Sequence, residues 1–418
     1  MMPDENFASS FAARWIEGPG KVSGGGGDGG GFGYWQPRTQ HLPQQQQQQQ
    51  QEGSPAIPPY TDFDRSYFRA YSDIAIHKEM IQDRVRTETY LAAIMKYRHL
   101  IFDKVVLDVG CGTGILAIFC AAAGAKRVYA VDASEIAEQA RHVVEDNNLS
   151  DRVTVLFGRV EDVSINEKVD IIISEWMGYM LLHENMLPSI IFSRDKWLKP
   201  GGLILPSHAS LFMAPVTYAD RYHERIGFWR DVHGIKMSAM LQLAKHSSHR
   251  EPHIEIIPRE NVVTRPILVK DVDCYTVTIQ ELESVTTRFC VTSTLRAPLH
   301  GFAFWFDAAF GGPAVYPSEQ HLQLPLMGPV DKISRVLCHK KQEMGSDAEI
   351  MLSTAPGKPP THWKQTMLYL YDPMTLNKGQ KIAGCVTVSQ SKENRRFLDI
   401  HLEFSVGGRT RVKVAEMR

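Results

Sequence analysis

The chain has 418 residues, which is long enough for two domains that each bury a core. Its 46 Lys+Arg balance 47 Asp+Glu, so it lacks the basic bias of nucleic-acid-binding domains and we expect no direct nucleic-acid partner. Its six cysteines form no Cys-x-x-Cys pair, and it has no signal peptide or long apolar run, so we expect reduced thiols, no membrane association and a nuclear or cytoplasmic location.

Residues 1–59 are of low complexity. Residues 24–33 are nearly all glycine, residues 44–51 are all glutamine, and three prolines follow before residue 60. Such a segment buries too little apolar surface to offset the entropy lost on ordering, so we expect a disordered tail.

Helical spacing of apolar residues begins near residue 60. The pattern from Tyr67 to Met95 predicts two helical pieces with a break around Ser72 and Asp73. Tyr67 and Tyr71 are four residues apart and would share one helix face.

A glycine-rich turn follows the first predicted strand, Val105–Val109. Gly110, Gly112 and Gly114 would let a ligand approach the backbone and expose amides at the start of the next helix. The second strand ends in Asp132, where an acid is placed to accept hydrogen bonds from a ribose diol. A tight turn alone would explain the glycines but not Asp132, so the pair indicates an adenosine-containing cofactor.

Strands and helices continue to alternate as far as residue 206. We expect a helix over residues 135–147, strands at Val153–Phe157 and Val169–Ile173, a helix over residues 187–198 and a strand from Leu203. This order predicts a parallel sheet with right-handed crossovers, whose ligands bind beyond the carboxyl ends of the strands. Asp132, Glu161 and Glu175 all fall at such ends.

Two glutamates occupy the apolar loop after the strand Val169–Ile173. Carboxylates are rarely buried without a partner, so Glu175 and Glu184 indicate a cationic ligand. Taken alone, however, the two glutamates are better explained as the cap of a turn, for Glu175, and as a solvated loop residue, for Glu184.

The pattern after residue 206 is typical of antiparallel strands. We expect strands at residues 275–279, 287–292, 301–306 and 401–406. Residues 218–249 form a helical insertion with many apolar side chains, which predicts an arm that docks on a partner, with self-association as the first expectation.

Four motifs, found in order, resemble the protein arginine methyltransferases, and the resemblance covers residues 60–418. It is closest to type I enzymes and, within them, to the plant type 6 group. The resemblance implies a Rossmann-like S-adenosyl-L-methionine domain in residues 60–206, an antiparallel β-barrel in residues 207–418 with a dimerisation arm at about 218–249, and a homodimer. The motifs are Val106 to Gly114, Ser174 to Tyr179 with Glu184, Thr361-His362-Trp363, and Tyr67-Phe68-x-x-Tyr71.

The resemblance also assigns site residues. Arg86 would hold the methionine carboxylate, Asp132 the ribose and Glu161 the adenine amino group, while many relatives have glutamate at the position of Asp132. No metal is expected. The catalytic residues would be Glu175, Glu184, His362 and Asp83; the cofactor contacts would be His77, Arg86, Asp108, Gly110, Gly112, Asp132, Glu161, Met80 and Tyr71; and Met80 and Met186 would shape the product, favouring asymmetric dimethylation.

The proposed chemistry explains the paired carboxylates. A substrate arginine has a pKa above ~12, so its nitrogens are protonated and poor nucleophiles. Two carboxylates grip the planar guanidinium, aim one nitrogen and draw positive charge toward the others. The family's usual substrates, histone tails and Gly/Arg-rich segments, are the expected protein partners.

Two other functions fit parts of the pattern. A methyltransferase acting on adenine bases would carry an Asn/Asp-Pro-Pro-aromatic motif where this chain has Ser174-Glu175-Trp176-Met177. A catalytically silent, cofactor-binding adaptor in a transcription complex would be favoured by loss of either glutamate or of His362, and all three are present.

Overall fold

The computed structural model describes residues 60–312 and 349–418. The predicted tail and Cys338 therefore lie outside the described residues. Residues Asp62–Arg418 form one compact unit. Among the described helices, none has the length and apolar character needed to cross a bilayer.

From residue 60 onward, four helices precede β1 (Val105–Val109). The predicted break near Ser72 and Asp73 is present, but a second break at Asp83 was not predicted. Asp83 ends one helix, and its side chain caps the next by accepting a hydrogen bond from the Arg86 amide at 3.0 Å. The apolar spacing runs on across this cap, so periodicity does not reveal it. The helices are α2 (Asp62–Ala70), α3 (Ile74–Gln82), α4 (Arg84–Lys96) and α5 (Arg98–Ile101).

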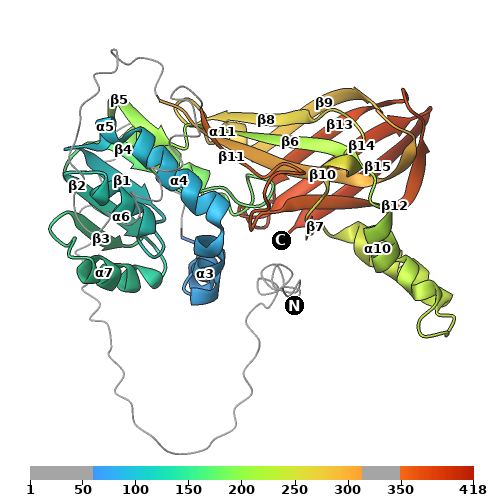
Figure 1. The fold of residues 1–418 in the computed structure, drawn as a ribbon, viewed down its shortest axis with the longest axis horizontal. Coiled ribbons are helices and arrows are strands. Elements are labelled where there is room, and N and C mark those ends of the chain that lie inside the picture. Colours follow the sequence, from blue (N-terminus) through green and yellow to red (C-terminus); the bar gives the residue numbers. More distant parts are fainter. Residues whose placement is uncertain (1–59, 313–348) are drawn as a thin grey trace, which may run out of the picture. The chain divides into compact units, whose positions relative to one another are not determined.

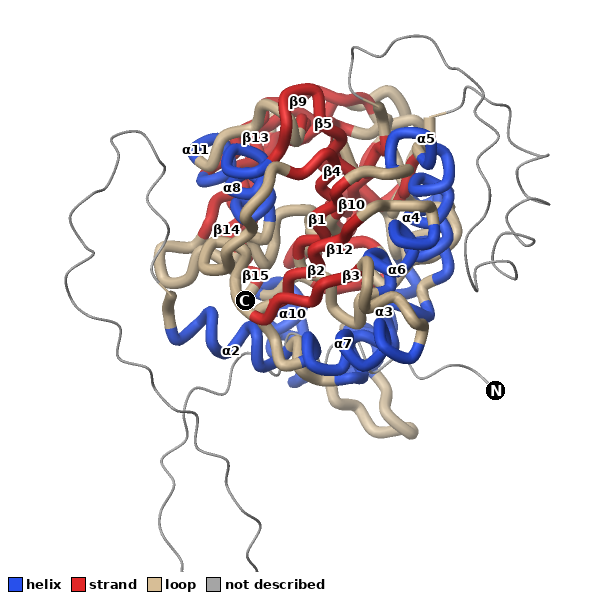
Figure 2. The backbone as a smooth tube through the Cα atoms, turned by 90° about the vertical axis from the view of Figure 1, so that its left-hand side faces the viewer, coloured by secondary structure: helices blue, strands red, loops and turns tan. Residues whose placement is uncertain are grey.

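A five-stranded parallel sheet follows, in the order β3-β2-β1-β4-β5. Every residue of its central strand is buried, as expected for a strand covered on both faces. Helices α4 and α6 lie on one face of the sheet and α8 on the other (Figure 2). The elements are β1 (Val105–Val109), α6 (Ile115–Ala122), β2 (Arg127–Asp132), α7 (Ile136–Asp146), β3 (Val153–Phe157), β4 (Val169–Ile173), α8 (Leu187–Trp197) and β5 (Leu198–Leu205).

After β5, the described strands form two antiparallel sheets that share a core (Figure 1). Phe302 on β10 links them, with its ring centroid 6.3 Å from that of Phe289 and 4.9 Å from that of Phe404. One sheet contains β6 (His208–Val216), β7 (His253–Glu255), β8 (Ile267–Asp273), β10 (Ala297–Phe310), β11 (Ile350–Ser353) and β12 (Gln365–Leu376), and the other contains β9 (Ser284–Thr292), β13 (Lys381–Gln390), β14 (Leu398–Val406) and β15 (Arg409–Met417).

The strand predicted at residues 275–279 is wrong. The carboxylate of Asp273 accepts hydrogen bonds from the Tyr275 amide at 2.9 Å and the Thr276 hydroxyl at 2.9 Å, which turns the chain immediately after β8. Local side-chain bonds of this kind compete with a strand ladder. The short helix α11 (Gln280–Glu283) comes next.

The predicted helical insertion follows β6. Several of its apolar side chains are exposed, among them Phe228 at 48%, Ile235 at 58% and Leu243 at 61%. Figure 1 shows α10 at the far side of the antiparallel sheets from the parallel sheet. The insertion contains α9 (Ala219–Arg225), the short 3-10 helices η1 (Gly227–Arg230) and η2 (Ser238–Met240), and α10 (Leu241–Arg250); a further 3-10 helix, η3 (Arg259–Asn261), follows β7.

Candidate active site

The chain leaving β4 is held against β1. The hydroxyl of Ser174 donates to the carbonyl of Val109 at 2.7 Å, and the hydroxyl of Tyr90 donates to the carbonyl of Ser174 at 2.9 Å. All three residues are buried. Glu175 therefore projects from a fixed point at the carboxyl end of the sheet.

Glu175 forms a buried ion pair with Arg86. Its Oε2 atom lies 3.0 Å from Arg86 Nε, and each side chain is 7% exposed. Arg86 Nη1 is buried and has no hydrogen-bond partner among the described residues. A buried guanidinium with a free donor is costly unless an acceptor completes it, so this site fits an anionic ligand such as a carboxylate.

Glu184 is half-buried, and tyrosines rather than a cation hold its carboxylate. The hydroxyls of Tyr67 and Tyr71 donate to Oε2 at 3.1 Å and 2.6 Å. Burial raises the pKa of Glu184 to about 7, and the charge of Glu175 adds to the increase while the two hydroxyls oppose it. Glu184 is thus not the solvated loop residue of the alternative interpretation.

The activity of wild-type protein should fall with decreasing pH through about 7, because a protonated Glu184 cannot pair with a guanidinium. A Tyr71→Phe variant loses a hydrogen bond that favours the carboxylate, so its acid limb should move to higher pH. The measurement is kcat/KM against pH, which reports groups of the free enzyme.

A matched control is Tyr129→Phe. It removes a 2.7 Å tyrosine–carboxylate hydrogen bond to Glu167, which precedes the amino end of β4, whereas Glu184 follows its carboxyl end. Its profile should overlay that of the wild type. An acid limb near pH 4.5 in the wild type, or no shift in Tyr71→Phe, would contradict the assignment to Glu184.

The loop between the two glutamates has an unusual backbone. Met180, Leu181, Glu184 and Asn185 all have positive φ, between 49° and 72°. Such conformations cost about 1–3 kcal/mol each for residues other than glycine and persist where the surroundings impose them. Gly178 is one such constraint, since a Cβ there would lie 2.0 Å from the carbonyl oxygen of His183.

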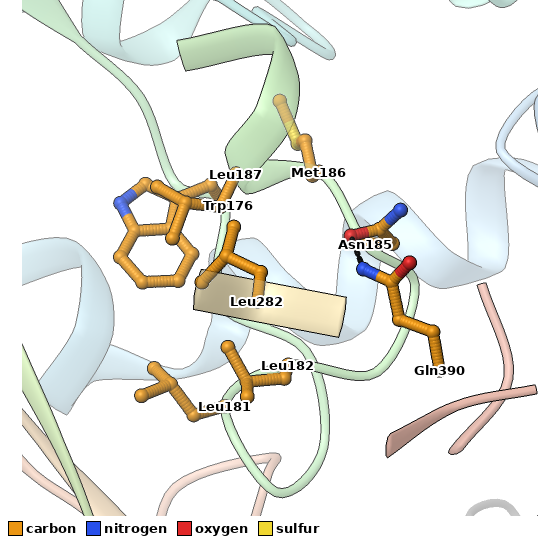
Figure 3. Close-up of a pocket in the computed structure, with 8 residues that line it drawn as sticks. All are labelled: Trp176, Leu181, Leu182, Asn185, Met186, Leu187, Leu282 and Gln390. Carbon is orange, nitrogen blue, oxygen red and sulfur yellow. Dashed lines mark hydrogen bonds between the residues drawn. The ribbon is translucent and has the colours of Figure 1, made fainter. Parts of the chain in front are cut away.

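A small pocket lies beneath this loop (Figure 3). Its polar members, Asn185 and Gln390, face each other and form a 2.9 Å hydrogen bond that ties the loop to β13. The other side chains that line it are Trp176, Leu181, Leu182, Met186, Leu187 and Leu282.

The glycine turn and Asp132 adjoin one another. The Gly112 amide donates to Asp132 Oδ2 at 2.8 Å, and the amide and hydroxyl of Ser134 donate to Oδ1 at 2.8 and 2.6 Å. Of the carboxylate's roughly four acceptor positions, one remains on Oδ2 for a ligand hydroxyl. The structure therefore orients Asp132 through protein contacts, and Ser134 is a site residue that the sequence analysis did not identify.

Other predicted cofactor residues border the same turn. Gly110 has φ +72°, and a Cβ there would meet the Met186 methyl at 2.3 Å, so only glycine fits. The buried ring of His77 lies beside Gly112 and donates from Nε2 to the Tyr71 carbonyl at 2.7 Å. Tyr71 thus contributes its carbonyl to His77 and its hydroxyl to Glu184.

Three predicted residues have weaker connections. Asp108 on β1 is fully buried, its carboxylate has no hydrogen-bond partner among the described residues, and burial raises its pKa to about 7. Glu161 accepts a hydrogen bond from the Ser189 hydroxyl at 2.7 Å. Met80 is half-buried on α3.

His362 and Asp83 form the predicted pair. Asp83 Oδ2 accepts from the amide of His362 at 2.9 Å and from its Nδ1 at 2.7 Å. Burial opposes ionisation of Asp83, but the bonds from His362 and the Arg86 amide outweigh it and lower the carboxyl pKa. Nδ1 as donor leaves Nε2 as the acceptor of a neutral ring. Asp83 therefore connects His362, through Arg86, to Glu175.

Comparisons with known proteins agree with this geometry. Residues 106–202 match a methyltransferase domain, and residues 207–342 and 320–409 match the arginine methyltransferase oligomerization subdomain. The chain is 59% identical over 369 residues to the "Probable protein arginine N-methyltransferase 6" of Arabidopsis thaliana, covering 88% of this chain and 84% of that one. This chain belongs to the protein arginine N-methyltransferase family.

Solved structures place the fold in the same family. A chain of the Trypanosoma brucei PRMT1 enzyme-prozyme complex with AdoHcy superimposes with a TM-score of 0.69 at 34% identity, covering 84% of this chain and all of that one. Arabidopsis thaliana protein arginine methyltransferase 10 does so with a TM-score of 0.68 at 33% identity, with the same coverage. The predicted family, its plant type 6 group, the fold class and S-adenosyl-L-methionine as cofactor are confirmed.

Proposed function

We propose that this arginine methyltransferase is a type I enzyme, forming monomethyl- and then asymmetric dimethylarginine. Its proposed substrates are histone tails and Gly/Arg-rich segments, and its proposed location is the nucleus, the cytoplasm or both. The observation that carries the proposal is the pair of carboxylates in one loop at the carboxyl edge of the sheet: Glu175, whose side chain is buried, and Glu184, which is half-buried.

The two glutamates would both bind a guanidinium, but their carboxylates have different partners in the protein. Glu175 lies 3.0 Å from Arg86 in an ion pair, whereas Glu184 Oε2 accepts hydrogen bonds from two tyrosine hydroxyls and burial raises the pKa of Glu184 to about 7. A substrate guanidinium would place a positive charge beside the carboxylate of Glu184. Held in this way, it has one nitrogen aimed and positive charge drawn to the others, and ideal orientation contributes up to about 7–11 kcal/mol.

The residues around the glycine turn fit S-adenosyl-L-methionine. Arg86 Nη1 would bind its carboxylate and Asp132 its ribose, and the methyl group of Met186 fills the space beside Gly110. When bound, this cofactor supplies an electrophilic methyl group. Asp83 holds His362 through Nδ1, so Nε2 would be the ring atom available to accept a proton.

A homodimer through the arm is part of the proposal. The exposed apolar side chains of the arm, Phe228, Ile235 and Leu243, supply the surface, and the matched oligomerization subdomain includes them. Apolar side chains gathered on one insertion favour a protein partner over solvent.

The product type is tested with isotopically labelled cofactor and a histone-tail or Gly/Arg-rich peptide. We expect monomethylarginine first and asymmetric dimethylarginine later, identified by mass spectrometry of the digested product. The resemblance to type I enzymes, which assigns Met80 and Met186 to shaping the product, supports this outcome, and both side chains are half-buried. Symmetric dimethylarginine alone would refute the type I assignment, and transfer to neither peptide would refute the substrate class.

A further inference from the structure

We propose that Arg396 is a positioning residue for methyl transfer, because it holds the backbone of Glu184 and helix α2, which carries Tyr67, in one arrangement. Arg396 lies in residues 391–397, the hairpin between β13 and β14. The proposal rests on the arginine-methylating function described above.

The first contacts are with Glu184 itself. The Glu184 amide donates to the Arg396 carbonyl at 2.8 Å, and Arg396 Nη1 donates to the Glu184 carbonyl at 2.8 Å. Arg396 therefore binds both ends of a residue whose φ is +72°. Such a conformation persists only where surrounding contacts impose it. These two bonds from the hairpin, with the Asn185–Gln390 bond from β13, are such contacts.

The second contacts are with α2. Arg396 Nε and Nη2 donate to Asp64 Oδ1 at 3.0 and 2.6 Å, and the guanidinium lies 3.9 Å from the ring centroid of Tyr67. Tyr67 is one of the two tyrosines whose hydroxyls bind the Glu184 carboxylate. One guanidinium thus sets the position of the Glu184 main chain and of the helix that orients its side chain.

The arrangement depends on the shape of the guanidinium as well as its charge. The planar fork spans three partners, Asp64, the face of Tyr67 and the Glu184 carbonyl, whereas an ammonium is a point charge on a flexible stem. The charge has its own effect: burial raises the pKa of Glu184, and Arg396 opposes that increase.

Two substitutions separate shape from charge. Arg396→Lys keeps the charge but not the fork, and we expect kcat to fall about 10- to 100-fold, since small misplacements of catalytic groups cost this much. Arg396→Gln should show the same loss together with an acid limb at higher pH. Asp64→Asn, which loosens α2 but leaves the Glu184 carbonyl bond intact, should show a smaller loss in the same direction.

The matched control is Arg395→Ala, since Arg395 is the exposed neighbour in the same hairpin. Its kcat, thermal melting and cofactor affinity should equal those of the wild type. The cofactor affinity of Arg396→Lys should also be retained. Wild-type activity in Arg396→Lys would overturn the positioning role. The role would also be overturned if the loss of kcat came with a lower melting temperature and weaker cofactor binding, and if Arg396→Gln showed no shift of the acid limb.

A binding measurement keeps the inference separate from the proposed function. Calorimetry with an arginine peptide and AdoHcy requires no turnover. We expect the peptide Kd of Arg396→Lys to rise about tenfold at pH 7.5, relative to wild type and Arg395→Ala. Wild-type protein that transfers no methyl group would refute the proposed function alone. Equal peptide affinities in wild type, Arg396→Lys and Arg395→Ala would refute the inference.

Discussion

Replacing Glu175 by glutamine should lower kcat for arginine methylation by about 10²–10³-fold, the loss typical of removing one charge-stabilising group from an active site. The amide keeps the shape of the side chain but loses the negative charge, so it can neither draw positive charge from the substrate guanidinium nor pair with Arg86. The measurement is transfer of a labelled methyl group to an arginine peptide at saturating cofactor.

Cofactor binding by Glu175→Gln should be retained, because the donor that would hold the methionine carboxylate, Arg86 Nη1, is not the one that pairs with Glu175. Glu138→Gln is the control, because this glutamate is exposed on α7. Full activity in Glu175→Gln would contradict the guanidinium-binding role.

Replacing Arg86 by alanine should weaken S-adenosyl-L-methionine binding by about 2–5 kcal/mol, the usual effect of truncating one member of a buried, hydrogen-bonded charge pair. The variant removes the donor proposed for the cofactor carboxylate and leaves Glu175 buried without its cation. Isothermal titration calorimetry measures the change directly. Arg86→Lys should recover only part of the loss, because an ammonium cannot replace the planar donor.

Arg84→Ala on the same helix provides the comparison. Its side chain is 79% exposed and pairs only with the helix neighbour Glu88 among the described residues, so its removal should change cofactor affinity by less than about 0.5 kcal/mol. Equal effects of Arg84→Ala and Arg86→Ala would show that Arg86 does not contact the cofactor.

Several site residues are predictable because their signals are local. The glycine turn and Asp132 follow from the need for a close backbone approach and an acid at a strand end. Glu175 lies directly after β4, so the apolar strand that precedes it places it at the sheet edge. The parallel order follows from the alternation of strands and helices.

Other features are not visible in the pattern. Arg396 contacts Glu184 across 212 residues, and Arg86 pairs with Glu175 across 89, with no spacing rule to connect them. Asp83 resembles an ordinary polar residue within an apolar helical pattern, although it caps one helix and binds His362 across 279 residues.

The α/β order of the first half, the antiparallel character of the second and the residues that end the strands follow from periodicity and neighbouring residues, so the sequence predicts them. The difference between the two glutamates arises from tertiary packing. Glu175 pairs with Arg86 and Glu184 accepts bonds from two tyrosine hydroxyls, and these partners come from distant segments that meet only when the parallel sheet, the segment Asp62–Tyr71 and the hairpin between β13 and β14 pack together.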